Sequence, residues 1–206
     1  KSYSILEQVV RNQNLTTQVT GIGKVMQGLV VDYPFTITSK LSIDSITEML
    51  FRIDFIDKEL KIIDFQNKEK EYVFKDFTTY GKKHNLPFEI SNVNKNDKTH
   101  EGYYVSIQPI YKRVMMLKEK ISVKPIGKES NIISVNLNST NPKYAKNVLN
   151  ELITVFNEDG IKDRQLIHKR TINFVNDRYR YLSLELDSIE INKKLFKISN
   201  NLVDLK

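Results

Sequence analysis

Residues 141–156, "NPKYAKNVLNELITVF", contain the clearest helix start in this chain. Asn141 is a residue type that caps helix N-termini, and Pro142 suits the first helical position, where no backbone N–H donor is needed. We therefore predict a helix that begins at Pro142. Its apolar stripe, which a sheet could cover, consists of Ala145, Leu149, Leu152 and Phe156.

This helix has no clear end in the sequence. After Pro142 the chain contains no further proline and one glycine, Gly160, which a helix tolerates at a cost of about 1 kcal/mol. We predict that the covered part ends in the polar stretch 157–165 and that the helix continues to Lys206. At 1.5 Å per residue, its length is on the order of 97 Å.

Beyond Gly160, apolar residues recur in alternating steps of three and four, the spacing of a coiled-coil seam. Lys193 and Asn200 interrupt this seam, and we expect them to fix its register. A long helix with such a stripe exposed is not stable alone in water, so it requires a returning helix or neighbouring copies of the chain. The predicted seam for helix pairing or oligomerisation consists of Ile172, Val175, Tyr179, Leu182, Leu186, Ile189 and Phe196.

Residues 1–138 combine helical and strand patterns. Apolar residues near the N-terminus share one side of a predicted helix, and short strands are expected within 33–41, 86–90 and 103–107, with a short helix around 111–118. Alternating apolar residues predict a hairpin over 49–65, turning at Asp57 and Lys58, and a second hairpin over 120–139. Segment 16–31 is predicted to be mainly loop, with one possible short strand, and segment 67–97 to be a loop-rich excursion.

The fold class predicted from these patterns is α+β. We expect a small mixed or antiparallel sheet base with packing helices, plus one long C-terminal helix with coiled-coil character. The base is placed at residues 1–160 and includes the first part of the long helix. The projecting helix is placed at 161–206 and is expected to be truncated before its return.

Composition limits the function only broadly. The chain has 206 residues, of which 40% are hydrophobic, enough for a core. The net charge of +7 suits phosphate, anionic lipid, an acidic glycan or solubility alone. No cysteine is present, which excludes a disulfide, a thiolate nucleophile and a cysteine-based zinc site. No apolar run approaches a membrane span and no signal peptide is recognised, but a start at Lys1 rather than methionine leads us to expect an excised segment.

No catalytic, cofactor or metal site is predicted. The stretch "TGIGKVMQG" lacks the spacing of a phosphate-binding loop, and we interpret it as a plain loop. His84, His100 and His168 lack the spacing of metal ligands. Carboxylate pairs such as Glu185 with Asp187, or Asp187 with Glu190, fit the solvated side of a helix, so nothing supports a general acid/base pair.

A basic cluster on the long helix is the best candidate for contact with an anionic glycan. The alternative is a solvated helix face that forms salt bridges between helices. Nucleic-acid binding has no recognised motif, and basic charge is its only support, so no nucleic-acid partner is predicted. The cluster consists of Lys162, Arg164, Lys169, Arg170, Arg178 and Arg180.

The stretch "NPKYAKNVLNELITVFNEDGIKDRQLIHKRTINFVNDRYRYLSLELDSIE" resembles the bacterial polysaccharide co-polymerase family, the chain-length determinants. Within it, "NEDGIKD" looks most like members fused to a tyrosine autokinase in Bacteroides-like bacteria, the capsular exopolysaccharide branch. "SYSILEQVVRNQNL" is similar to the first helix of the family. The residues that carry the resemblance are Asn141, Pro142, Ala145, Leu149, Asn150, Phe156, Thr171, Phe174, Val175, Arg178, Leu182, Leu186 and Glu190.

The resemblance implies a periplasmic or extracellular α/β domain between two membrane spans. It also implies assembly into rings that set polysaccharide length without glycosyl transfer. The expected function is therefore an extracytoplasmic oligomerisation and regulatory domain that controls the length and export of capsular or exopolysaccharide at the cell inner membrane. Expected partners are further copies of the chain as a homo-oligomer, a polysaccharide polymerase or outer-membrane export protein, the growing polysaccharide, and the membrane through flanking spans. No enzyme activity is expected in this chain, although the parent protein could carry a cytoplasmic protein-tyrosine kinase domain.

Two other functions remain open at this point. A periplasmic adaptor of the membrane-fusion type also projects a helical hairpin, but it predicts half of a lipoyl-like or barrel sequence on each side of that hairpin. An enzyme that acts on glycans through an unrecognised carboxylate pair predicts glycan turnover that single carboxylate mutations abolish.

Overall fold

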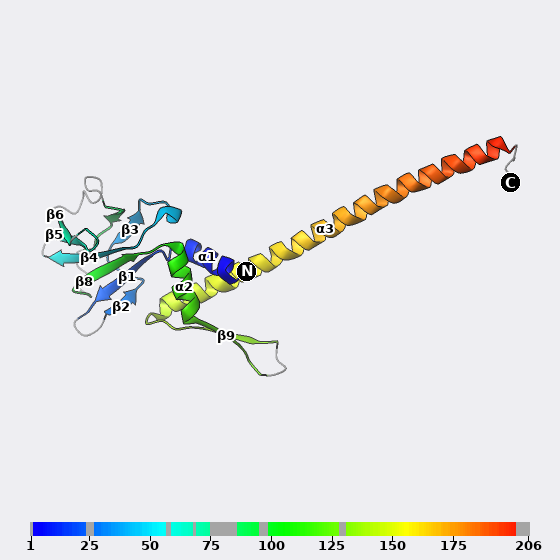
Figure 1. Cartoon of the computed structure of the whole chain (residues 1–206). Coiled ribbons are helices and arrows are strands. Elements are labelled where there is room, and N and C mark those ends of the chain that lie inside the picture. Colours follow the sequence, from blue (N-terminus) through cyan, green and yellow to red (C-terminus); the bar gives the residue numbers. More distant parts are fainter. Residues whose placement is uncertain are drawn as a thin grey trace. The chain divides into compact units, whose positions relative to one another are not determined.

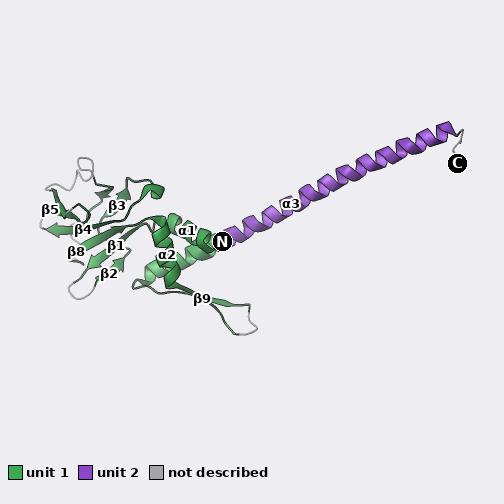
Figure 2. Ribbon diagram, in the orientation of Figure 1, with its two compact units in different colours: residues 1–156 green, residues 157–206 purple. Residues whose placement is uncertain are grey.

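The computed structural model describes residues 2–23, 27–56, 59–67, 69–74, 86–94, 99–127 and 131–200. They belong to two compact units, Lys1–Phe156 and Asn157–Lys206, which Figure 2 shows in different colours. The sequence placed this boundary between residues 160 and 161.

Unit 1 contains a six-stranded sheet in which every neighbouring pair is antiparallel, with strand order β2-β1-β8-β4-β5-β6 (Figure 1). Alternate residues of its central strands are buried, as expected for a sheet with one face against a core. The strands are β1 (Thr17–Ile22), β2 (Gln27–Val30), β4 (Met49–Ile56), β5 (Glu59–Asp64), β6 (Lys70–Phe74) and β8 (Gly102–Ile107).

The predicted hairpin over 49–65 is confirmed as β4 and β5. Ile53 lies opposite Ile62 and Phe55 opposite Leu60 in the register of this pair. The predicted turn at Asp57 and Lys58 lies outside the described residues. The strand predicted within 103–107 is confirmed as β8, which pairs with both β1 and β4.

Two smaller sheets accompany the large one. β3 (Thr36–Ser39) pairs with β7 (Phe88–Ser91), which confirms the strands expected within 33–41 and 86–90. β9 (Ile121–Pro125) pairs with β10 (Ile133–Leu137) and confirms the second predicted hairpin.

Two segments depart from the sequence predictions. Segment 16–31 contains the paired strands β1 and β2, and β1 lies inside the large sheet between β2 and β8. Its alternation is hard to see because the buried position after Val19 is Gly21, where a Cβ would overlap the ring of His100. Segment 67–97 contributes β6 at the edge of the same sheet as well as β7.

Three helices form a second core in unit 1. α1 (Ser2–Asn12) confirms the predicted N-terminal helix, and α2 (Ile110–Lys120) confirms the short helix expected around 111–118. α3 (Pro142–Ser199) contributes its first turns, and a single 3-10 turn, η1 (Ile43–Ser45), packs at the edge. The buried residues of this core are Leu6, Val9, Val10, Leu15, Ile110, Val114, Leu117, Val148 and Val155.

The start of α3 has the predicted cap. The Oδ1 atom of Asn141 accepts a hydrogen bond from the backbone N–H of Tyr144 at 2.9 Å. The Nδ2 atom of Asn141 donates to the carbonyl oxygen of Leu29 in β2 at 3.0 Å. One side chain therefore caps the helix and also ties its first turn to the sheet.

The buried stripe of α3 is shifted by one position from the predicted one, towards the N-terminus. Val148 and Val155 are 1% exposed, whereas Phe156 is 60% exposed. Leu152 packs against the helical core as predicted, but Ala145 and Leu149 do not belong to that core. Because apolar residues stand side by side at 148–149 and 155–156, spacing alone did not decide which of each pair turns inward.

The predicted continuation of the helix past Gly160 is confirmed as far as Ser199. Residues 201–206, where the prediction ended, lie outside the described residues. Together, the antiparallel sheets, the packing helices and the long C-terminal helix confirm the α+β fold class. Within the described part of the chain, no helix has the length and apolarity to cross a membrane.

Candidate binding surfaces

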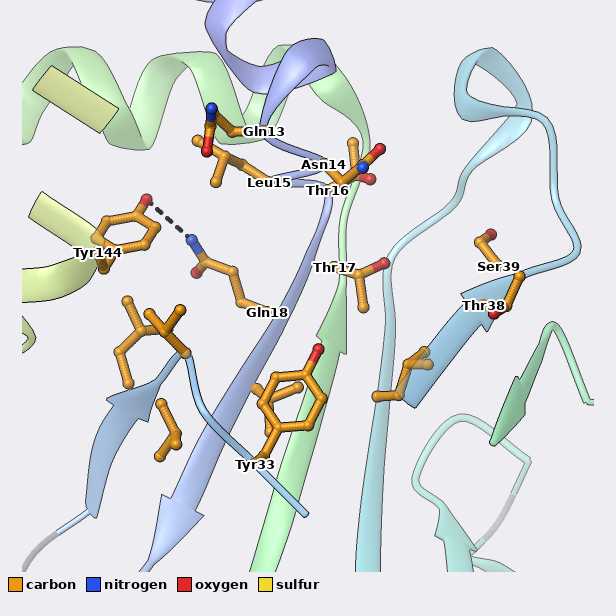
Figure 3. A pocket seen from close by; sticks show the side chains of 15 residues that line it. Gln13, Asn14, Leu15, Thr16, Thr17, Gln18, Tyr33, Thr38, Ser39 and Tyr144 are labelled. Carbon is orange, nitrogen blue, oxygen red and sulfur yellow. Dashed lines mark hydrogen bonds between the residues drawn. The ribbon is translucent and has the colours of Figure 1, made fainter. Parts of the chain in front are cut away.

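A cavity of about 470 Å³ opens in unit 1 beside the first strands of the sheet. Its walls come from the turn between α1 and β1, from β1, β2 and β3, and from the first turn of α3 (Figure 3). Asn14, in the turn between α1 and β1, has a φ of 50°, a left-handed conformation that asparagine tolerates. The lining residues are Gln13, Asn14, Leu15, Thr16, Thr17, Gln18, Val19, Leu29, Val30, Val31, Tyr33, Ile37, Thr38, Ser39 and Tyr144.

Two tyrosines bring both rings and hydroxyls to this cavity. Burial raises the pKa of Tyr33 above its usual value of 10, and burial is also the main reason why the pKa of Tyr144 is raised. Both hydroxyls therefore stay protonated at neutral pH and can donate as well as accept hydrogen bonds.

A buried arginine fixes one wall of the cavity. Arg113 is 5% exposed, and its Nη1 donates to Oε1 of Gln18 at 2.7 Å, while its Nη2 donates to the carbonyl oxygen of Ser106 at 2.9 Å. Burial lowers the pKa of Arg113 to about 10. Gln18 in turn donates from Nε2 to the hydroxyl of Tyr144 at 3.2 Å (Figure 3). The amide of Gln18 is thus oriented at both ends.

Every residue of the predicted seam on α3 is exposed in unit 2. Its seven side chains are between 46% and 72% exposed, with Leu182 the least and Tyr179 the most exposed. Taking Ile172 as heptad position a, they occupy positions a and d. These residues share one exposed face of the helix, and their role in pairing or oligomerisation remains a prediction.

A second apolar stripe, which the sequence analysis missed, runs along the same part of α3. Each of its members follows a seam position by two residues, for example Leu184 after Leu182 and Ile191 after Ile189, which turns it by roughly 200° to the opposite side. Its spacing is visible in the sequence, two residues after each seam position. The second stripe, at positions c and f, consists of Phe174, Tyr181, Leu184, Ile191, Leu195 and Ile198, all exposed.

Two polar strips separate these apolar faces. Within α3 the interruptions of the apolar faces themselves are Lys193 in the seam and Asp177 and Ser188 in the second stripe, and Asn200 interrupts the seam directly after α3 ends. The wide strip, at positions b and e, consists of Asn173, Asn176, Arg180, Ser183, Asp187, Glu190, Lys194 and Lys197. The narrow strip, at position g, consists of Arg178, Glu185, Asn192 and Ser199.

The predicted glycan-contacting residues do not form one patch. Arg180 belongs to the wide strip, and Lys162 and Lys169 lie in line with it. Arg170 lies in line with the second stripe. Arg164 and Arg178 lie in line with the narrow strip. The Nε atom of Arg164 donates to the carbonyl oxygen of Gly160 at 3.2 Å, and the guanidinium of Arg178 lies 5.5 Å from the ring centre of Tyr181. The glycan role of these residues remains a prediction.

The histidines and carboxylates that were considered as possible ligands or catalysts do not come together in a site among the described residues. The ring of His100 lies against Gly21 and 5.3 Å from the ring centre of Tyr103. His84 and Lys24 lie outside the described residues. Among the residues that the structure describes, no cluster of three histidine or acidic side chains could hold a metal ion. Glu185, Asp187 and Glu190 are exposed on α3.

Comparison with known proteins shows similarity over part of the chain. No protein-family model matches the chain. A stretch of 80 residues is 30% identical to a protein of Ralstonia solanacearum named "Putative tyrosine-protein kinase EpsB". The match covers 39% of this chain and 11% of that protein. Part of the chain is therefore similar to a small part of a protein named as a tyrosine kinase.

Proposed function

We propose that this chain is the extracytoplasmic domain of a membrane-anchored polysaccharide co-polymerase, which controls the chain length and export of a capsular polysaccharide or exopolysaccharide. The chain itself carries no catalytic role in this proposal. Its parent belongs to the tyrosine-autokinase branch, and a Bacteroides-like relationship within that branch remains a prediction from "NEDGIKD" alone.

The observation that carries the proposal is the exposed seam of α3. Seven large side chains at positions a and d face solvent along one helix, and this surface is stable only when other helices cover it. A chain-length regulator that works as a homo-oligomer supplies such helices from neighbouring copies.

The second stripe supports assembly of more than two helices. With apolar residues on opposite sides, each helix can pack against two others at the same time. Contacts that use different faces of identical subunits generate closed rings when the rotation closes. A ring of copies is therefore compatible with the two faces of α3, whereas a simple helix pair would leave one face exposed.

The similarity to EpsB supports the choice of branch. That protein is named as a tyrosine kinase, and the match covers 11% of its length. In the proposal, the domain lies in the periplasm at the inner membrane, flanking spans anchor it, and its partners are a polymerase or outer-membrane export protein and the growing polysaccharide.

The proposal is tested by deleting the parent gene in the producing strain. We expect the length distribution of the surface polysaccharide to change while its sugar composition stays the same, because the protein sets length and forms no glycosidic bond. Complementation with the intact gene serves as the control. An unchanged length distribution in the deletion strain would overturn the proposed function.

A further inference from the structure

We propose that the cavity of unit 1 is a binding site for uncharged saccharide units. The inference rests on the proposed function in one respect, namely that the growing polysaccharide supplies the ligand. The cavity, of about 470 Å³, falls within the roughly 300–1,000 Å³ typical of sites for small ligands. It is formed entirely by residues of unit 1.

The lining of the cavity excludes charge. None of its 15 residues is Asp, Glu, Lys or Arg, although these types make up 28% of the chain. Binding sites for phosphate, carboxylate or sulfate groups offer cations or oriented backbone N–H groups. A ligand that is polar but uncharged therefore matches this cavity best.

The polar groups present are those that hydrogen-bond to sugar hydroxyls. Among the described residues, no hydrogen bond involves the side-chain hydroxyls of Thr17, Tyr33 or Thr38, so each has its donor and acceptor capacity available. Figure 3 shows the hydroxyl end of Tyr33 pointing to the side of the cavity on which Thr17 lies. The side chains that bear a hydroxyl or an amide are Gln13, Asn14, Thr16, Thr17, Gln18, Tyr33, Thr38, Ser39 and Tyr144.

The same cavity offers apolar surface for the C–H faces of a sugar ring. The rings of Tyr33 and Tyr144 and the side chains of Leu29, Val30 and Val31 supply it. Aromatic rings that also carry a polar group bind amphipathic ligands in this way, since one part of the ring packs while its hydroxyl hydrogen-bonds.

Part of the site is organised before a ligand binds. Gln18 is held by Arg113 and Tyr144, and Nε2 of Gln13 donates to Oε2 of Glu151 at 3.0 Å. The amide oxygen of Gln13 is consequently directed away from Glu151. Side chains that are already ordered lose little conformational entropy on binding, which favours affinity.

The experiment measures binding of oligosaccharides to the purified 206-residue chain by saturation-transfer NMR and calorimetry. The probes are neutral oligosaccharides released by partial acid hydrolysis from the polysaccharide of the producing strain, with hyaluronan hexasaccharide as the anionic comparison. The test variant is Tyr33→Phe with Thr17→Val, which removes two hydroxyls and keeps the side-chain shapes. The matched control is Tyr111→Phe with Thr154→Val, because Tyr111 and Thr154 lie outside the cavity.

We expect a neutral probe to bind the native chain and the control variant equally, and the test variant about tenfold more weakly. Thr38→Val, at an exposed position of β3, should also weaken binding. It replaces the double variant as the test if the double variant does not fold. Equal binding by the folded cavity variants would overturn the site, as would the absence of neutral binding at millimolar concentration. Tighter binding of the hyaluronan hexasaccharide would overturn the uncharged class of ligand.

These outcomes are distinct from failure of the proposed function. If deletion of the parent gene leaves polysaccharide length unchanged but the probes bind at the cavity, the chain-length role is overturned and the saccharide site is supported. If deletion changes the length but no neutral probe binds, the saccharide site alone falls.

Discussion

The side-chain oxygen of Asn141 accepts a hydrogen bond from the backbone N–H of Tyr144, three residues along the chain, at 2.9 Å. This cap sets the first turn of α3 so that the Tyr144 ring lines the cavity and its hydroxyl meets Gln18. The start of the long helix and one wall of the proposed saccharide site therefore depend on the same residue.

Replacing Asn141 should lower the free energy of unfolding in a graded way. Asn141→Ala loses the cap and the bond to Leu29, and we expect a loss of about 1–3 kcal/mol. Asn141→Asp keeps the acceptor for Tyr144 but loses the donor to Leu29, so its free energy of unfolding should lie between those of the native chain and the alanine variant. Urea denaturation measures the order, and an alanine variant as stable as the native chain would contradict it.

The two cavity tyrosines predict a loss of stability at alkaline pH. Their pKa values are raised in the folded state by burial, so the unfolded chain loses these protons first as the pH rises through about 10. Below pH 10 the contribution to stability is fully present, and it declines as the pH rises from there through the folded pKa values.

The measurement is the free energy of unfolding between pH 8 and pH 11. Tyr33→Phe with Tyr144→Phe should make the decline of the free energy of unfolding shallower, because the two hydroxyls with raised pKa values are removed. Tyr111→Phe, which changes an exposed tyrosine, is the control and should leave the slope as it is. A slope that the double variant does not alter would show that these two groups do not cause the decline.

Charges in the seam should weaken self-association of the full-length protein. Leu182→Asp with Leu186→Asp places two carboxylates where an interhelical contact would bury them, at a cost that such a contact does not recover. We expect the variant oligomer in detergent to be weaker, so that it already dissociates at a protein concentration at least tenfold higher than the concentration at which the native oligomer dissociates. Mass photometry or sedimentation measures this concentration. Ser183→Asp with Asn192→Asp adds the same charge on the polar strips and should leave the oligomer intact.

The second stripe should be as sensitive as the seam. Leu184→Asp with Ile191→Asp changes exposed residues on the opposite side of α3 and should also weaken the oligomer, since both faces require covering helices. If this variant behaves like the polar-strip control, then one face suffices and the two-faced packing is wrong.

Charge reversal tests the predicted glycan contacts on α3. Arg170→Glu with Arg178→Glu should change the product length or reduce the polysaccharide retained at the cell surface. Lys146→Glu, which reverses an exposed charge on α3 within unit 1, is the control. If the length distribution of the polymer matches that of the control, both arginines belong to a solvated helix face and do not contact the glycan.

The elements with strong local signals were predictable from the sequence. The cap at Asn141 and the alternation over 49–65 depend on neighbouring residues, so short-range physics was enough. Segment 16–31 was predicted to hold at most one short strand, whereas it holds β1 and β2, because β1 is paired by β2 and β8 and its own pattern is broken by Gly21. The shift from Phe156 to Val155 was equally inaccessible, since the core that selects Val155 is formed by α1 and α2.

The candidate sites divide in the same way. The seam was visible because a heptad repeat is a property of one segment, and the second stripe was open to the same reasoning. The cavity was not, because it joins Gln13, Tyr33, Ser39 and Tyr144 from distant parts of the chain. Its uncharged lining emerges only when these segments are brought together.

The proposed role of the seam in chain-length control is measured by the length distribution of the surface polysaccharide in a strain that lacks the parent gene. The strain is complemented with the native gene, with Leu182→Asp and Leu186→Asp, or with Ser183→Asp and Asn192→Asp. We predict that the native gene and the polar-strip control restore the native distribution, whereas the seam variant, produced at equal level, leaves it altered with unchanged sugar composition. A native distribution from the seam variant would contradict the account.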